Sequence, residues 1–167
     1  MKAFQLNAIA TAAAIALCAG IGTAGGVYAA ENPFASLAGS WSGVGRISVQ
    51  DGSSERIRCR GSYRPDRAGT SLALHLRCAS DSYTFELSSD ITNERGVLSG
   101  SWNESSRQVY GSLSGRVAGG HIQATASSPA FTATLSIETR GNSQNVVIRA
   151  PGSQISEVTV RLARAGR

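Results

Sequence analysis

The sequence of 167 residues has little of what a recognisable enzyme needs. It contains two histidines and three cysteines, and it lacks the HExxH, Cys-x-x-Cys, GxSxG and Walker motifs. A serine nucleophile requires a positioned base, and His75 and His121 lie far apart in the chain. The length excludes a multidomain enzyme. We therefore expect a non-enzymatic protein, with an enzyme that pairs two loop carboxylates as an alternative.

The same scarcity argues against cofactors and nucleic acid. Neither histidine has the companion histidines or cysteines that a metal site requires. The sequence thus predicts no metal and no cofactor. Aromatic residues make up 6% of the chain, which leaves few exposed rings on which bases could stack. We therefore expect no nucleic acid among its partners.

The N-terminus has the three parts of an export signal. A positive start at Lys2 precedes an uncharged stretch from Ala8 to Ala24, and the small residues Val27 and Ala29 follow. We predict a cleavable signal peptide at residues 1–29, with the cut after Ala29, and a single domain at residues 30–167. The protein would then be periplasmic or secreted.

Two other interpretations of this segment are weaker. A membrane anchor needs about 20 strongly apolar residues, whereas this stretch is mostly alanine and ends in glycines. A lipoprotein signal needs a small residue before the cysteine, and Leu17 precedes Cys18. We expect no stable membrane span after cleavage and the loss of Cys18 with the peptide. Lys2 is the only lysine, so every cationic side chain of the mature chain would be arginine.

From Trp41 onward, apolar residues alternate with a period of two, and no helical period of 3.6 residues is found. The first inward row is Trp41, Gly43, Gly45, Ile47 and Val49. Glycine, proline, asparagine and aspartate interrupt this alternation at regular intervals. The pattern predicts an all-β fold, an antiparallel up-and-down barrel of about eight to ten strands, with a β-sandwich as the alternative. Inward glycines favour the barrel because strong curvature needs them.

The two mature cysteines provide a test of strand register. If the strands around the turn from Pro65 to Thr70 pair as a hairpin, Cys59 lies opposite Cys78 on the inward face. Cross-strand neighbours lie about 4.5 to 5.5 Å apart, within disulfide reach. In an exported protein such a pair is oxidised. We therefore predict a disulfide between Cys59 and Cys78.

Arginine clusters on the outward positions of the same strands. A turn at Asp51 to Ser53 would place Arg46 opposite Arg58, and the next hairpin places Arg60 opposite Arg77. Like charges directly opposite each other destabilise a sheet. The cluster of Arg46, Arg58, Arg60 and Arg77 is thus a candidate site for an anionic envelope component. Neutralisation by acids such as Glu86, or a solvated face that limits aggregation, remains an alternative.

Short motifs carry a family resemblance. Gly39-Ser40-Trp41 resembles the Gly-x-Trp signature of lipocalins and other calycins, and Leu98 to Trp102 repeats the Leu-x-Gly-Ser-Trp of Leu37 to Trp41, as in avidin-like barrels. The first strand also resembles nitrobindin-like barrels. The resemblance implies that Trp41 plugs one end of the barrel and that a late arginine, Arg161 or Arg164, packs on it. The late histidine that would bind haem in a nitrobindin-like barrel is missing. The chain also resembles small secreted proteins of unknown function from Gram-negative bacteria.

These observations lead to two functional hypotheses. Inward glycine and alanine could leave room for a small apolar or amphipathic ligand, because eight or more strands can enclose one. The candidate ligand-binding residues are Trp41, Trp102, Tyr63 and Phe85. Core packing is the alternative role for both tryptophans. The second hypothesis is an interaction or inhibitor protein that acts through its arginines. We expect a monomer in either case.

Overall fold

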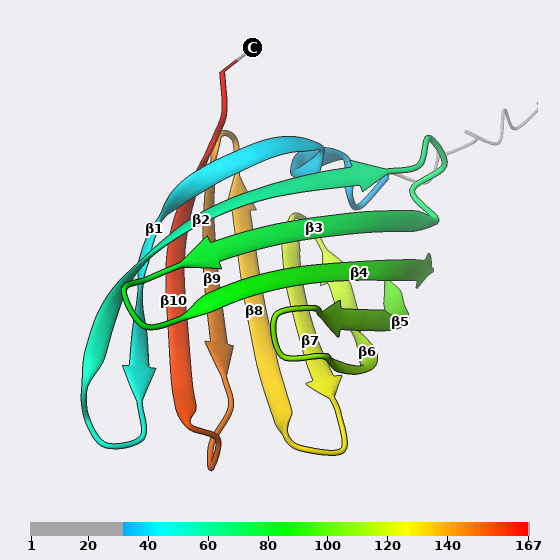
Figure 1. Cartoon of the computed structure of the whole chain (residues 1–167). Coiled ribbons are helices and arrows are strands. Elements are labelled where there is room, and N and C mark those ends of the chain that lie inside the picture. The colour runs from blue at the N-terminus through cyan, green and yellow to red at the C-terminus, as the bar shows by residue number, and fades with distance from the viewer. Residues whose placement is uncertain (1–31, 167) are drawn as a thin grey trace, which may run out of the picture.

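The computed structural model describes residues 32–166, and the predicted signal peptide with Cys18 lies outside them. The described chain consists of a short 3-10 turn and ten strands (Figure 1). The elements are η1 (Ala35–Leu37), β1 (Gly39–Val49), β2 (Ser54–Pro65), β3 (Ser71–Ala79), β4 (Thr84–Glu94), β5 (Val97–Glu104), β6 (Val109–Ala118), β7 (His121–Ser127), β8 (Thr132–Arg140), β9 (Ser143–Arg149) and β10 (Ile155–Arg164). No helix within residues 32–166 has the length and apolar character needed to cross a membrane.

The strands form one closed antiparallel barrel. Each strand pairs with the next along the chain, and β10 returns to pair with β1 through Trp41 and Arg164 at one end and Ile47 and Val158 near the other. This pairing leaves no open sheet edge. The prediction of an all-β, up-and-down barrel is confirmed, and the alternative β-sandwich is wrong because the first and last strands are bonded to each other.

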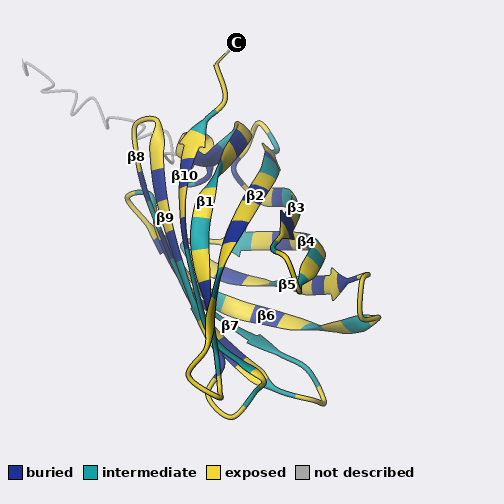
Figure 2. Cartoon of the chain, turned by 60° about the vertical axis from the view of Figure 1, so that its left-hand side comes forward, coloured by how far each residue is buried: buried dark blue, intermediate teal, exposed yellow. Residues whose placement is uncertain are grey.

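Side chains alternate between the barrel interior and the solvent, as their period of two predicts. On β1, Trp41 and Ile47 are buried while Val44 and Arg46 face outward. Figure 2 shows the alternation as bands of buried and exposed residues along the strands. The interior is therefore mainly apolar, and the outer wall carries arginine, serine and threonine.

Glycines allow neighbouring backbones to approach closely on the inner side of the wall. A Cβ atom at Gly43 would lie 1.9 Å from the carbonyl oxygen of Arg161, and one at Gly111 would lie 1.9 Å from that of Ser127. Real Cβ atoms do not approach backbone oxygens so closely. The inward glycines are therefore required by the close approach of adjacent strands, in agreement with the prediction from curvature.

The β2–β3 hairpin has the predicted register. Cys59 lies opposite Cys78 and Arg60 lies opposite Arg77. The cysteines form a disulfide, with their Cα atoms 4.1 Å apart. The disulfide closes the hairpin on the inner side of the barrel.

The β1–β2 hairpin corrects one prediction. Arg46 lies opposite Arg56, and Arg58 lies opposite Val44. The turn is centred on Asp51, because the Val49 amide donates to the Ser53 carbonyl and the Asp51 carboxylate accepts from the Ser53 amide. The register thus differs by two residues from the predicted one. A shift of two keeps every side chain on its predicted face.

The end of the barrel beside η1 is closed by apolar side chains. Phe34 and Leu37 are buried, and the Trp41 indole donates a hydrogen bond of 2.8 Å to the Leu37 carbonyl. The guanidinium of Arg164 lies 4.4 Å from the centre of the Trp41 ring and donates to the carbonyls of Ser36 and Ala38. Trp41 therefore plugs this end, and Arg164, not Arg161, is the late arginine that packs on it.

Candidate functional site

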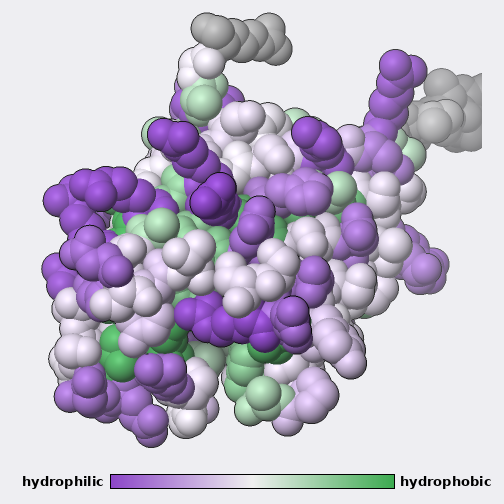
Figure 3. All heavy atoms as spheres, in the orientation of Figure 1, coloured by the Kyte–Doolittle hydropathy of each residue, from purple (hydrophilic) through white to green (hydrophobic). Residues whose placement is uncertain are grey.

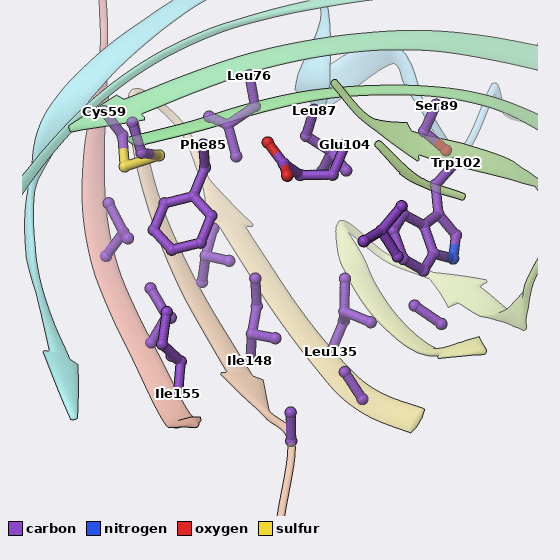
Figure 4. A pocket seen from close by; sticks show the side chains of 18 of the residues that line it. Cys59, Leu76, Phe85, Leu87, Ser89, Trp102, Glu104, Leu135, Ile148 and Ile155 are labelled. Atoms are coloured by element: carbon purple, nitrogen blue, oxygen red, sulfur yellow. A yellow bond between two sulfur atoms is a disulfide. The ribbon is translucent and has the colours of Figure 1, made fainter. Parts of the chain in front are cut away.

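The other end of the barrel contains a cavity of about 450 Å³. Its wall is almost entirely apolar and includes Leu76, Leu87, Leu135 and Ile148 from both halves of the barrel. In the space-filling view of Figure 3, hydrophobic side chains are visible between hydrophilic ones in the lower half of the molecule. Figure 4 shows the side chains converging on the interior space. The barrel is thus filled at one end and hollow at the other.

Loops surround the entrance to this cavity. Phe131 from the β7–β8 loop, Gln154 from the β9–β10 loop and Arg107 from the β5–β6 loop all line it. The Gln50 amide at the β1–β2 turn donates to the Gln154 carbonyl over 2.9 Å. The entrance therefore lies at the end of the barrel opposite η1.

Aromatic side chains shape one side of the cavity. The rings of Trp102 and Phe131 lie 5.8 Å apart and tilted, and the Trp102 indole donates to the Ser112 carbonyl over 3.0 Å. A Cβ atom at Gly111 would lie 2.9 Å from the Trp102 ring. The glycine leaves space for the indole against the wall, so the polar N–H is satisfied and an apolar ring is presented to the cavity.

Three of the four predicted ligand-binding residues line the cavity. These are Tyr63, Phe85 and Trp102. Trp41 lies outside it, buried in the closed end described above. The sequence could not separate the two tryptophans because both follow the same Leu-x-Gly-Ser pattern. Only the preceding 3-10 turn distinguishes Trp41.

A buried polar chain closes the deep side of the cavity. The Tyr63 hydroxyl donates to Gln144 Oε1 over 2.8 Å, and Gln144 Nε2 donates to Thr139 Oγ1 over 3.0 Å. Burial raises the pKa of Tyr63 to about 12, against the opposite effect of its hydrogen bond to Gln144. Tyr63 is thus a neutral phenol whose hydroxyl is already paired. Gln144 is not among the residues predicted from the sequence, although it occupies an inward position two residues before Val146.

Glu104 places a carboxylate in this apolar wall (Figure 4). Its Oε1 accepts hydrogen bonds from the amides of Glu86 and Ser106, and its Oε2 accepts one from the amide of Arg107. Burial acts to raise the pKa of Glu104, but the hydrogen bonds from Glu86, Ser106 and Arg107 outweigh it and hold the pKa below its ordinary value. The carboxylate is therefore ionised and fastens the β5–β6 turn to β4.

Arg107 lies at the entrance, beside this carboxylate. Its guanidinium is 4.5 Å from the centre of the Phe85 ring and donates to the Thr84 carbonyl over 3.1 Å. The distance from its Nη1 to Glu104 Oε2 is 3.7 Å, and the side chain is 41% exposed. The guanidinium thus packs on the Phe85 ring at the edge of the cavity, and the side chain also meets solvent. The sequence suggested loop carboxylates only as a general alternative, and neither Glu104 nor Arg107 was singled out from it.

The polar groups of the cavity are satisfied by the protein itself. Ser89, which also lines the wall, donates to the Ser101 carbonyl over 2.8 Å. Within residues 32–166 no buried side-chain nitrogen or oxygen lacks a hydrogen-bond partner. A ligand in the interior would therefore contact apolar surface. It would find polar groups with unused hydrogen-bonding capacity only at the entrance.

The predicted arginines lie elsewhere, on the outer wall. Arg46, Arg58, Arg60 and Arg77 are all exposed and face away from the cavity. Arg56 and Arg161 belong to the same surface, because Arg56 lies opposite Arg46 and Arg161 lies opposite Val44. We refer to these six residues as the arginine face. The structure thus separates the two sets of candidate residues into an interior and an exterior site.

Comparison with known proteins identifies the fold and no family. No protein-family model matches the chain, and no curated protein matches its sequence. Among solved structures, Rv2717c from M. tuberculosis is similar at 15% identity, with a TM-score of 0.63 over 82% of this chain and 99% of that chain. An S-type phycobiliprotein lyase, CPES from Guillardia theta, is similar at 9% identity, with a TM-score of 0.54 over 80% of this chain and 91% of that chain. The ten-strand barrel and these neighbours fit a calycin-like, lipocalin-type fold.

Proposed function

We propose that this protein is an exported, non-enzymatic binding protein that holds a small apolar or amphipathic molecule in the barrel. The observation that carries the proposal is the apolar cavity of about 450 Å³ with an entrance at one end. Ligand sites of proteins are typically apolar clefts of about 300 to 1,000 Å³. The cavity is therefore large enough for a small organic molecule.

The wall determines the chemistry of the occupant. Burial of apolar surface contributes roughly 25 cal/mol per Å², and the paired hydroxyls of Tyr63 and Ser89 offer a ligand no unsatisfied group in the interior. A polar ligand would lose its hydration there without replacement. Arg107 at the entrance, whose side chain is 41% exposed, can meet a polar end. The ligand is thus an apolar body with or without a polar head.

The titratable groups of the cavity are already bonded within the protein, which supports ligand binding rather than catalysis. The Glu104 carboxylate accepts three backbone hydrogen bonds, and both cavity cysteines are in the disulfide. A general base must instead be free to take a proton from its substrate. The neighbour described as a phycobiliprotein lyase makes an enzyme the alternative, with Glu104 as the acid or base.

Export is supported by the disulfide, because such bonds persist in oxidising compartments. In a Gram-negative host the mature protein would begin at Ala30, which N-terminal sequencing of the periplasmic fraction can establish. Recovery of the intact chain from the cytoplasm would contradict this part of the proposal.

Filling the cavity should weaken binding of an apolar probe. The probe is N-phenyl-1-naphthylamine, a neutral compound that fluoresces in apolar surroundings, excited directly and titrated with delipidated protein. We expect the double variant Leu135→Trp/Ile148→Trp, which adds bulk to the cavity wall, to bind at least about tenfold more weakly than the wild type, a loss of about 1.4 kcal/mol.

The matched control is Val97→Trp/Tyr110→Trp, which adds the same rings at exposed positions of the outer wall. It should bind the probe as the wild type does. Thermal unfolding of both variants shows whether each is folded. Wild-type protein that does not bind, or a folded cavity variant that binds normally, would overturn the proposal.

A further inference from the structure

The arginine face concentrates positive charge on one part of the barrel wall. Its residues occupy outward positions of four adjacent strands, β10, β1, β2 and β3. The outward positions of β1, β2 and β3 carry no acidic residue, and Glu157 on β10 forms an ion pair with Arg149 on β9. By contrast, the outward positions of β5 to β7 are mostly serine, threonine, asparagine and glutamine. The charge of the wall is therefore strongly one-sided.

This concentration is unfavourable for the isolated barrel. Arg46 lies opposite Arg56, and Arg60 lies opposite Arg77. Like charges opposite each other destabilise a sheet. Among residues 32–166 the ion pairs are Arg107–Glu104, Arg140–Glu138 and Arg149–Glu157. None of them involves the arginine face, and Glu86, which lies opposite Arg77 on β4, does not relieve it by an ion pair.

The shape of the arginine face indicates the kind of anion that it would meet. Neighbouring strands lie about 4.8 Å apart, and outward residues follow one another along a strand at about 6.6 Å. The arginines are thus spread over an area of the wall rather than along a line. Val44, which is 43% exposed, lies among them between Arg58 and Arg161. A small anion needs a concave site, whereas a plane of phosphates can contact such a wall at many points. An apolar side chain in its centre also suits a lipid surface.

The arginine face continues to the cavity entrance. Arg46 and Arg56 are its members nearest to the β1–β2 turn. That turn is hydrogen-bonded to the β9–β10 loop through Gln50 and Gln154, and Gln154 lines the cavity. Figure 1 shows the β1–β2 and β9–β10 turns at the same end of the barrel. A surface bound along the arginine face would therefore lie beside the entrance.

We propose that the arginine face docks the barrel on a lipid surface that bears anionic phosphate headgroups. The guanidinium groups contact lipid phosphates, and Val44 lies against the headgroup layer. The docked protein then has its entrance at the bilayer, where an apolar ligand can pass between lipid and cavity; this last role rests on the proposed function. Docking itself needs only the outer wall.

Sedimentation with vesicles tests docking. The full mature protein is mixed with vesicles of phosphatidylcholine alone or with added phosphatidylglycerol, at low and high salt. Each arginine near an anionic membrane contributes about 1 kcal/mol. We therefore expect salt-sensitive binding to the anionic vesicles, and about 100-fold weaker binding by the triple variant Arg58→Ser/Arg60→Ser/Arg77→Ser.

The matched control removes three positive charges that lie outside the arginine face, at the β4–β5 turn and on β6 and β8. It is Arg95→Asn/Arg116→Ser/Arg140→Ser, in which asparagine suits the positive φ of Arg95. We expect it to bind the anionic vesicles within a few-fold of the wild type. Equal loss in both variants, or no binding of wild-type protein to anionic vesicles, would overturn the proposal. Binding to soluble heparin without binding to vesicles would also overturn it, in favour of a polyanion partner.

Two further readouts separate this inference from the proposed function. The triple variant should bind N-phenyl-1-naphthylamine like the wild type, because its arginines lie outside the cavity. It should also unfold at the same or a higher temperature, because like-charge repulsion is removed. Normal probe binding without vesicle docking would refute docking alone, whereas docking without probe binding would refute the proposed cavity function alone.

Discussion

At the scale of single residues, Glu104 shows how a charged side chain can be retained in an apolar cavity. Its three backbone partners come from β4 and from the β5–β6 turn. Hydrogen bonds to a charged group contribute more than neutral ones, about 1.5 to 3 kcal/mol. The carboxylate therefore has a structural role, which is to stabilise the local fold, and it is not held free for a substrate.

This role predicts a pH-dependent effect of Glu104→Gln. The folded-state pKa of Glu104 lies below the ordinary value of 4.5, so its stabilisation is complete above that value and is lost as the pH falls through the folded pKa. We expect the variant to lose about 2 kcal/mol of unfolding free energy near neutral pH, and the difference from wild type to shrink in acid. Urea denaturation at several pH values measures both quantities.

The control is Glu86→Gln, which changes an exposed carboxylate on the outer side of β4. Its effect on the unfolding free energy should be within about 0.5 kcal/mol of zero. A loss for Glu104→Gln that stays constant from neutral to acid pH would show that ionisation of Glu104 is not what stabilises the turn.

Residue roles were only partly predictable from the sequence. The alternation of apolar residues placed Tyr63, Phe85 and Trp102 inside the barrel, and all three line the cavity. The pattern could not show that Trp41 is removed from the cavity, because its hydrogen bond partner, Leu37, belongs to a short turn without any periodicity. Nor could it pair Tyr63 with Gln144, since that contact joins β2 to β9 across the interior.

At the scale of strands and turns, local sequence patterns predicted more of the structure than they did at the scale of residue roles. The fold, the number of strands and the β2–β3 register all follow from period-two alternation and from two cysteines at matching inward positions. The β1–β2 register did not, because several turns are compatible with Asp51 and Gly52. The Asp51 side chain selected the turn by accepting the Ser53 amide, a contact that the position of the glycine alone does not specify.

The close approach of strands at the inward glycines leads to a prediction about stability. In Gly111→Ala the added methyl group would meet the Ser127 carbonyl oxygen and the Trp102 ring. Overpacking of this kind costs about 1 to 3 kcal/mol, so we expect a lower unfolding free energy in urea. Gly166→Ala is the control, since no atom lies within 4 Å of its Cβ position and its φ is not positive. Equal stability of the two variants would contradict the requirement for close strand approach.

At the scale of the whole molecule, the barrel is asymmetric in two directions. Along its axis, Phe34, Leu37 and Trp41 fill one end while the cavity opens at the other. Around its circumference, the six residues of the arginine face lie on β10 to β3, whereas the outward residues of β5 to β7 are mostly uncharged and polar. The first asymmetry supports the proposed ligand binding, and the second supports docking. Neither is visible in the overall composition, because it averages over all surfaces.

The most direct test of ligand binding uses the two tryptophans as position markers. Trp102 lines the cavity and Trp41 plugs the opposite end. A brominated alkane quenches tryptophan fluorescence only on contact, so it reports which ring it touches. Trp41→Phe leaves Trp102 as the fluorophore, and Trp102→Phe leaves Trp41. We predict saturable quenching in Trp41→Phe and little in Trp102→Phe. Absence of quenching in Trp41→Phe, or equal quenching in both variants, would contradict the cavity as the binding site.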